Sequence, residues 1–122
     1  MLSDVSTYLA AQGITCTVIL DRMVPRPVNV IMLEDRTNPK PDHTYDRQLI
    51  KFMGLTITVR SANYTTAEAL MSSVFTALDM AQFTSAGGTR YIKIEAEGSM
   101  NRIPVDFAGV GLEQYYTVWI AD

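Results

Sequence analysis

Two alternating strand patterns separated by a capped helix pattern limit the folds open to this chain more than any other feature. Residues 49–60 read LIKFMGLTITVR, in which apolar residues alternate with threonines as in a half-buried strand. Residues 65–82 carry apolar side chains at helical spacing, and residues 90–97 (RYIKIEAE) alternate again. This order predicts a strand, a helix and a strand, with the helix packed on one face of a sheet.

The helix in this unit has both a start signal and a defined apolar face. Thr65 and Glu68 have the spacing of a capping box, which predicts a helix from Thr65 to about Gln82. The Gly87-Gly88 pair predicts the turn into the next strand. The face expected to be buried carries Ala67, Leu70, Met71, Val74, Phe75, Leu78 and Ala81.

The flanking segments supply the remaining elements. Ser3 is suited to cap a helix that begins at Asp4, and Gly13 is suited to end it. Short β-branched runs predict strands at residues 15–20 and 28–33, and an aromatic run predicts a closing strand at residues 114–120. We therefore expect a single α+β domain over residues 1–122, with a mostly antiparallel β-sheet and two helices packed on one face.

Two segments lack a regular pattern. Residues 34–47 (EDRTNPKPDHTYDR) contain two prolines and seven charged residues, which predicts a long flexible loop. Such a loop is a candidate partner-binding element, although a solvated loop without a partner explains the same composition equally well. Residues 98–106 (GSMNRIPVD) are the second segment predicted to be irregular.

Both segments contain residue types that recur at protein interfaces. Opposite charges in the first could pair across a subunit boundary and set its register; they belong to Asp35, Arg36, Lys40, Asp42, His43, Asp46 and Arg47. Tyr, Met and Arg are enriched at interfaces, which selects Met100, Asn101 and Arg102 in the second segment. We expect Tyr91 and Lys93 to join them from the outward face of the strand at residues 90–97.

Composition excludes several classes of function. The net charge of −3 argues against sequence-specific nucleic-acid binding, because such domains are normally basic. No apolar run approaches the roughly 20 residues of a membrane span. The single cysteine, Cys16, excludes an intrachain disulfide and favours a reducing compartment, and the first residues lack the basic region of a signal peptide.

No pattern in the chain predicts catalysis, a metal site or a cofactor. His43 is the only histidine, and Cys16 lies in an apolar run typical of a buried residue. Neighbouring carboxylates occur only in a loop (Glu34 and Asp35) or on an outward strand face (Glu95 and Glu97), where nothing would raise their pKa for acid catalysis. We therefore expect a protein that is not an enzyme.

Spaced features of the chain resemble a family of phage minor capsid or tail completion proteins, which belongs with the tail terminators of long-tailed phages. One sequence motif of this family has an arginine, a small residue and an aromatic residue, followed by a helix that begins with an acidic residue and alanine. Arg60, Ser61, Tyr64, Glu68 and Ala69 match this motif. A second motif of the family, glycine-threonine-arginine-tyrosine, lies at the start of the next strand. Gly88, Thr89, Arg90 and Tyr91 match it. Many family members have a glycine-arginine-aspartate motif before the last strand. The corresponding segment here, PVDFAGVGLEQYY, lacks that motif.

The resemblance implies an α+β fold and a structural role without enzymatic activity. It implies a ring, hexameric in the virion, that caps the tail tube and joins it to the head. The implied partners are other copies of the chain, the tail tube protein and a head–tail connector protein, and the implied location is the head-proximal end of the tail after assembly in the host cytoplasm. Other readings are a different head–tail connector (a stopper or adaptor), a minor capsid protein or, more distantly, a small cytoplasmic ligand-binding domain.

Overall fold

The computed structural model describes residues 1–14, 16–20, 29–36, 50–103 and 109–121. In chain order its elements are α1 (Leu2–Ala11), β1 (Thr17–Leu20), β2 (Val30–Arg36), β3 (Ile50–Ser61), α2 (Tyr64–Leu78), β4 (Ala81–Thr84), β5 (Arg90–Ile103) and β6 (Val110–Ala121). The strands form a six-stranded sheet in the order β1-β2-β3-β6-β5-β4. β1 and β2 are parallel, and the other neighbouring pairs are antiparallel.

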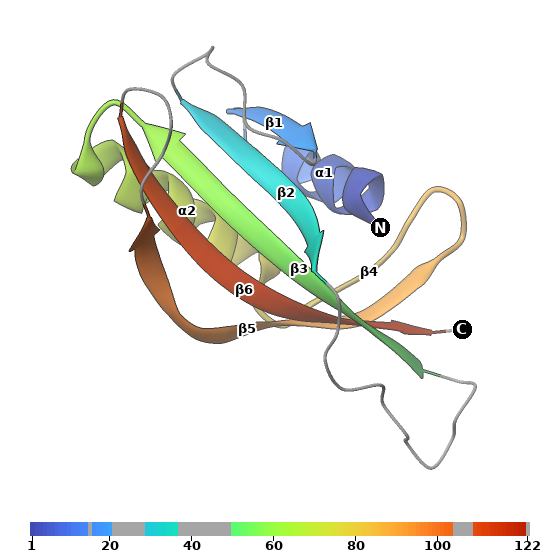
Figure 1. Ribbon diagram of the computed structural model, residues 1–122. Helices are drawn as coiled ribbons and strands as arrows, with labels where there is room; N and C mark the ends of the chain where they lie inside the picture. The colour runs from blue at the N-terminus through green and yellow to red at the C-terminus, as the bar shows by residue number, and fades with distance from the viewer. Residues whose placement is uncertain (15, 21–28, 37–49, 104–108, 122) are drawn as a thin grey trace.

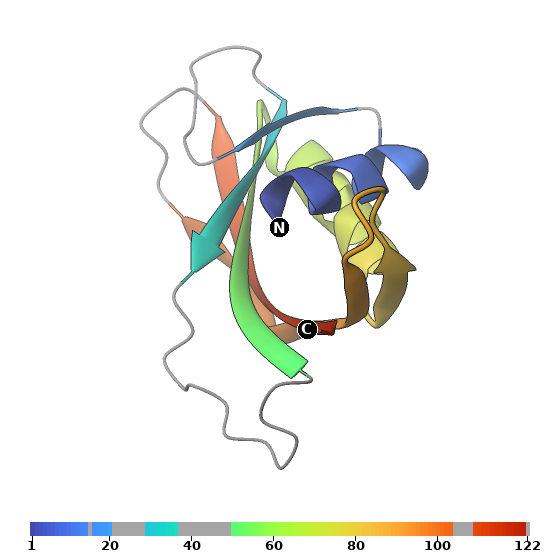
Figure 2. The same ribbon diagram turned by 90° about the vertical axis from the view of Figure 1, so that its right-hand side faces the viewer.

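The sheet curls around the two helices, which lie on the same side of it (Figures 1 and 2). We refer to the helix-covered side as the inner face and to the opposite side as the outer face. The predicted α+β fold, with a mostly antiparallel sheet and both helices on one face, is confirmed.

The long ladder between β3 and β6 forms the centre of the sheet. The two strands pair over twelve consecutive positions, from Ile50 with Ala121 to Ser61 with Val110. Because successive side chains point to opposite faces, Leu55, Ile57 and Val59 all point to the inner face, and each is fully buried. This ladder therefore fixes which side of the sheet the helices can cover.

The core lies between this inner face and the two helices. α1 contributes Val5 and Leu9, which are completely buried, and α2 contributes one buried residue per turn. Those residues are Ala67, Met71, Val74 and Leu78, at the spacing that the sequence predicts for an amphipathic helix. Burying such side chains stabilises the fold by about 1.5–3 kcal/mol for each large aliphatic residue.

Four features of the strands differ from the sequence prediction. β2 continues through Arg36, so residues 34–36 belong to the sheet and not to a loop. β5 continues to Ile103, so residues 98–103 are strand where an irregular segment was expected. β6 begins at Val110, four residues earlier than predicted, and the short strand β4 was not predicted at all. In β2 and β5, pairing with a long neighbouring strand extends polar segments whose own propensity for strand is low.

The ends of the helices also differ from the prediction. The N-cap of α2 is Asn63, whose side-chain oxygen accepts a hydrogen bond from the Thr66 amide at 2.9 Å, so the expected Thr65 capping box is wrong. Asn caps a helix at least as well as Thr and lies two residues earlier. α2 ends at Leu78 instead of near residue 82. α1 begins at Leu2, ahead of the expected Ser3 cap.

A bulge in β5 is held by a buried side chain of β6. The register of β5 against β6 shifts between Glu97 and Asn101, as it does between Tyr91 and Lys93. The Gln114 amide nitrogen donates to the carbonyl oxygens of Glu97 and Gly98, each at 3.1 Å. Gln114 is 3% exposed, so these bonds satisfy a buried polar group while fixing the bend of β5.

The turn between α2 and β4 contains strained backbone. Met80 has a φ of +61° and is the only non-glycine with positive φ among the described residues. Its amide donates to the Ile94 carbonyl at 2.6 Å, which holds the turn against β5. The left-handed conformation costs an L-residue about 1–2 kcal/mol.

Replacing Met80 with glycine should therefore stabilise the protein. The Met80 side chain is 54% exposed, so its removal sacrifices little burial while Gly relieves the backbone. We expect Met80→Gly to raise the free energy of unfolding by about 1 kcal/mol in urea denaturation. Met80→Ala truncates the side chain without relieving the backbone and is the control. An equal gain in both variants would show that the backbone is not the cause.

Candidate assembly surface

The first predicted contact region is only partly within the described residues. Asp35 is exposed near the end of β2, and Arg36 is the last residue of that strand. The other five residues predicted there, Lys40, Asp42, His43, Asp46 and Arg47, lie outside the described part of the chain. Their predicted contact role stays a prediction.

Tyr91 does not lie on the outward face of its strand, as the sequence had suggested. The register shift after Tyr91 turns its side chain to the inner face, where it is 2% exposed. Its hydroxyl donates a hydrogen bond of 2.6 Å to the Asp4 carboxylate of α1. Burial, and then the Asp4 carboxylate, raise the pKa of Tyr91 well above its ordinary value. Tyr91 thus ties β5 to α1 inside the fold.

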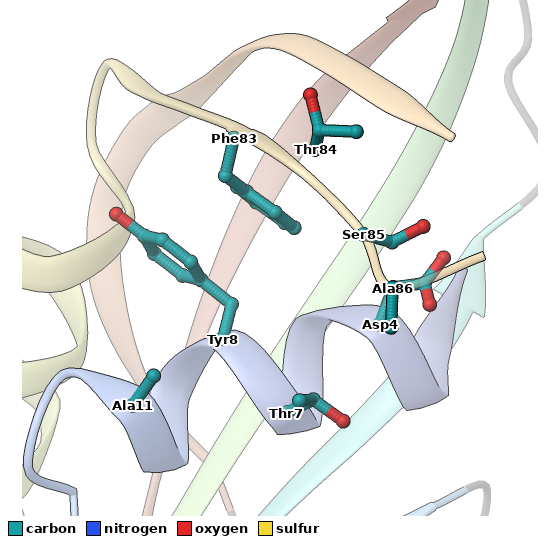
Figure 3. A pocket seen from close by; sticks show the side chains of 8 residues that line it. All are labelled: Asp4, Thr7, Tyr8, Ala11, Phe83, Thr84, Ser85 and Ala86. Carbon is teal, nitrogen blue, oxygen red and sulfur yellow. The ribbon is translucent and has the colours of Figure 1, made fainter. Parts of the chain in front are cut away.

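Tyr91 ends a stack of three aromatic rings between α1 and the β4–β5 hairpin. The Phe83 ring lies 4.1 Å from the Tyr8 ring and 4.6 Å from the Tyr91 ring, centroid to centroid. Beside the stack is a groove of about 200 Å³, lined by Asp4, Thr7, Tyr8, Ala11, Phe83, Thr84, Ser85 and Ala86 (Figure 3). Ligand sites usually enclose about 300–1,000 Å³, so the groove is small for a metabolite.

A wider surface hollow, about 450 Å³, lies where the end of α1 and the start of β1 approach α2. Cys16 and Asn29 are among its lining residues, and the Cys16 thiol donates to the Asn29 carbonyl oxygen at 3.3 Å. Burial raises the pKa of Cys16, with a smaller opposing effect from the Thr17 backbone. A thiol with a raised pKa is a poor nucleophile near neutral pH.

The described residues show no cluster suited to metal chemistry and no membrane-spanning helix. Across those residues, no three His, Cys, Asp or Glu side chains lie close enough to share an ion. None of the described helices is long and apolar enough to cross a bilayer.

Lys93 lies on the outer face, as predicted. Its ammonium is 3.7 Å from the Glu95 carboxylate and 4.1 Å from the centroid of the Trp119 ring. Trp119 also meets Phe52 edge to face, with the ring centroids 5.2 Å apart. A cation and two aromatic rings therefore lie together on the side of the sheet away from the helices.

The other predicted contact residues lie near the end of β5. Asn101 and Arg102 are exposed, whereas Met100 is half-buried and packs against the core. The Arg102 guanidinium lies over the Tyr64 ring at the start of α2, 5.6 Å from its centroid. The end of β5 and the start of α2 therefore form one surface here, where the sequence predicted an irregular segment.

The sequence prediction missed three exposed apolar side chains, two on α2 and one just after its end. Tyr64, Phe75 and Met80 are 42%, 41% and 54% exposed, although Phe75 was expected in the core. The helix places Phe75 at the edge of the buried stripe, which is centred on Met71, Val74 and Leu78. One signal was available in the sequence, because Glu68 is the only charged residue of α2, and a solvated helix face is usually rich in charge.

Comparison with known proteins identifies the fold and no family. No family model matches the chain, and no curated protein matches it. A solved chain from the virion of a native gene transfer agent (GTA) particle is 17% identical, with a TM-score of 0.64; the alignment covers 100% of this chain and 95% of that one. A second solved protein, known by a sequence identifier alone, is 12% identical with a TM-score of 0.61, covering 97% and 88%. At these identities the likeness establishes a shared fold.

Removing the Tyr91 hydroxyl should weaken the fold and reduce its sensitivity to alkali. Because the pKa of Tyr91 is raised on folding, its contribution to stability is present below about pH 10, the pKa of an unfolded tyrosine, and is lost as the pH rises above it. Tyr91→Phe should cost about 1.5–3 kcal/mol at neutral pH, the usual value of a hydrogen bond to a charged group. It should also make the free energy of unfolding fall less between neutral pH and pH values above about 10.

Urea denaturation at neutral and alkaline pH measures both effects. Tyr8→Phe removes a hydroxyl from the same aromatic stack without touching the Asp4 contact, and it serves as the control. If wild type and Tyr91→Phe lose equal stability in alkali, the titration of Tyr91 is not part of the alkaline response.

Proposed function

We propose that this chain is a structural protein of a phage-like virion and acts as its tail terminator. In this role it forms a ring, hexameric in the virion, at the head-proximal end of the tail. The ring stops tube growth and joins the tail to the head. The observation that carries the proposal is the likeness, over the full length of the chain, to a chain of a GTA virion. The match of Arg60, Ser61 and Tyr64 to the motif of the tail completion family supports it independently.

The surface of the molecule supports self-association. A ring subunit contacts its two neighbours through two different patches, so apolar surface left exposed on one subunit is an expected feature. Tyr64, Phe75 and Met80 expose such apolar area, and the Tyr64 ring also contacts Arg102. Retaining a large apolar residue at the strained position of Met80 fits a role outside the folded monomer.

A structural role also fits the hollows described above better than catalysis does. The small groove is lined by one carboxylate, Asp4, which already accepts the Tyr91 hydrogen bond. The wider hollow contains Cys16, whose raised pKa disfavours the thiolate. We therefore propose no enzymatic activity and no cofactor.

A second candidate is another component of the head–tail junction, such as a stopper or adaptor. The GTA chain is described as part of the virion particle, which fits this role as well as that of a terminator. Such a component would bind the capsid instead of the tail tube. Co-sedimentation of the purified protein with capsids, and not with tail tubes, would favour the second candidate.

Purified tail tubes provide the direct test of the terminator role. We expect wild-type protein to cap one end of the tubes in negative-stain micrographs and to halt further polymerisation of the tube protein. Tubes that stay uncapped and keep growing at saturating protein would reject the proposal.

Phe75→Ser should impair capping without unfolding the protein. Interface aromatics commonly contribute more than about 1 kcal/mol, so we expect capping to require about tenfold more protein. Phe75→Tyr keeps the ring and should cap like wild type. Because Phe75 is 41% exposed, the thermal midpoint of Phe75→Ser should stay close to that of wild type. Normal capping by Phe75→Ser would exclude Phe75 from the ring interface.

A further inference from the structure

We propose that an arginine contact joins the subunits of the ring. The Arg102 side chain of one copy enters the groove between α1 and the β4–β5 hairpin of the next copy and pairs there with Asp4. The inference rests on the proposed function, because it takes the ring as given and names the contact between its members. Subunits of such a ring contact each other through two different patches, and here the patches are the groove and the end of β5.

The groove has the size and lining of a site for one long side chain. It encloses about 200 Å³, and Asp4 is the only charged residue among those that line it. Asp4 and Tyr8 project from one face of α1 toward the hairpin, as Figure 3 shows. Residues four apart on a helix have Cβ atoms about 5–6 Å apart. The alkyl part of an arginine side chain can therefore lie along the Tyr8 ring while its guanidinium reaches the Asp4 carboxylate.

The Asp4 carboxylate has room for a further donor. One of its oxygens, Oδ2, accepts the Tyr91 hydroxyl at 2.6 Å, and no lysine or arginine among the described side chains pairs with this carboxylate. The Thr7 hydroxyl nearby donates to the Ser3 carbonyl oxygen at 3.0 Å. Because a carboxylate offers about four acceptor sites, Asp4 can bind a guanidinium without giving up the Tyr91 hydrogen bond.

Arg102 is the described cation that suits this role. Four lysine or arginine side chains are described, and three of them are unsuited. Arg60 is buried, and Lys93 is already paired with a glutamate. Arg90 is exposed, but it precedes the inward-facing Tyr91 in the hairpin and so points to the outer face. Among the four, only Arg102 is exposed away from the hairpin that forms the groove.

The contacts of Arg102 leave its guanidinium accessible. It lies over the Tyr64 ring, 5.6 Å from the centroid, and Tyr64 is itself 42% exposed. The Glu68 carboxylate accepts a hydrogen bond from the Tyr64 hydroxyl, which raises the pKa of Tyr64. Tyr64 belongs to the apolar area already proposed for subunit contacts, so Arg102 adjoins that area.

The two patches lie at opposite ends of β5. Tyr91 bonds Asp4 at the groove from near the start of the strand, whereas Arg102 is the second-to-last residue. At about 3.3 Å per residue, the strand between them spans roughly 30 Å. Figure 1 shows the β4–β5 hairpin and the end of β5 on opposite sides of the molecule. Arg102 is thus too far from the groove of its own chain, so the contact joins different copies, and its opposite charges set the register of the boundary.

Chemical cross-linking tests the contact in the intact protein. The background is Cys16→Ser, which removes the native thiol. Ala86→Cys then places a thiol on the groove, and Asn101→Cys places one beside Arg102; both positions are exposed. We expect a flexible bismaleimide to link these chains into a ladder that reaches the hexamer, with free protein at high concentration or with protein on tail tubes. A chain with only one of the two cysteines should stop at dimers.

Two variants of equal charge test the arginine. Arg102→Gln removes the proposed contact and should lower the yield of the ladder about tenfold, as expected for a hydrogen-bonded charge pair. Arg90→Gln removes the same charge from the other exposed arginine, on the outer face, and should change the yield less than twofold.

A charge exchange tests the groove. Thr7 lines the groove and is exposed, so Thr7→Lys adds a cation beside Asp4 without touching the core. Thr7→Lys should lower the yield by itself and restore it when combined with Arg102→Glu. Ala10→Lys adds the same charge at an exposed position of α1 that does not line the groove, and it should not restore the yield.

Three outcomes would overturn the proposal. Equal losses with Arg102→Gln and Arg90→Gln would show that overall charge, and not this contact, governs association. A failure of Thr7→Lys to restore the ladder of Arg102→Glu would show that Arg102 acts elsewhere. The absence of a ladder both at high concentration and on tubes would remove the contact, and the terminator proposal would still stand if the same protein caps the tubes. A ladder that depends on Arg102, together with tubes that stay uncapped, would keep the contact and reject the terminator role.

Discussion

The β3–β6 ladder is the constraint on which the rest of the structure depends. Twelve consecutive pairs fix the phase of both strands, and a shift of one residue would exchange their two faces. With this phase, Leu55, Ile57 and Val59 face the helices. On β6 the same phase sends Leu112, Tyr116 and Val118 to the core and Tyr115 and Trp119 to the outer face.

From that phase follows a molecule with two unlike surfaces. α1 and α2 cover the inner face. The side-chain amide of Gln114, a buried polar group on this face, donates its hydrogen bonds to carbonyl oxygens of β5. The outer face carries carboxylates, basic groups and aromatic rings, whereas α2 exposes Tyr64 and Phe75 beside its single charged residue, Glu68.

The sequence predicted the fold class more successfully than the contact residues. Alternation in residues 49–60 and helical spacing in residues 65–82 are local patterns. The strand appears at Ile50–Ser61, and the helix appears at Tyr64–Leu78, about one turn shorter than predicted. The prediction of an irregular segment at residues 98–106 was wrong for its first six residues, because they pair with β6 and form strand. The prediction that Tyr91 faces outward was wrong, because a bulge after it places its side chain on the inner face. The pattern RYIKIEAE gives no sign of that bulge.

By itself, the sequence determined the order of the elements other than β4 and the buried stripe of α2 at Ala67, Met71, Val74 and Leu78, because each of these depends on residues close together in the chain. The tertiary structure decided which strands became edges, where β5 bends, and that Tyr64, Phe75 and Met80 stay exposed. It also gathered Glu34, Glu97 and Tyr115 from three strands into one row. Strand register sets the arrangements within the sheet, and helix packing on the sheet sets which apolar side chains stay exposed. Both follow from the fit of distant segments to one another, which no local pattern contains.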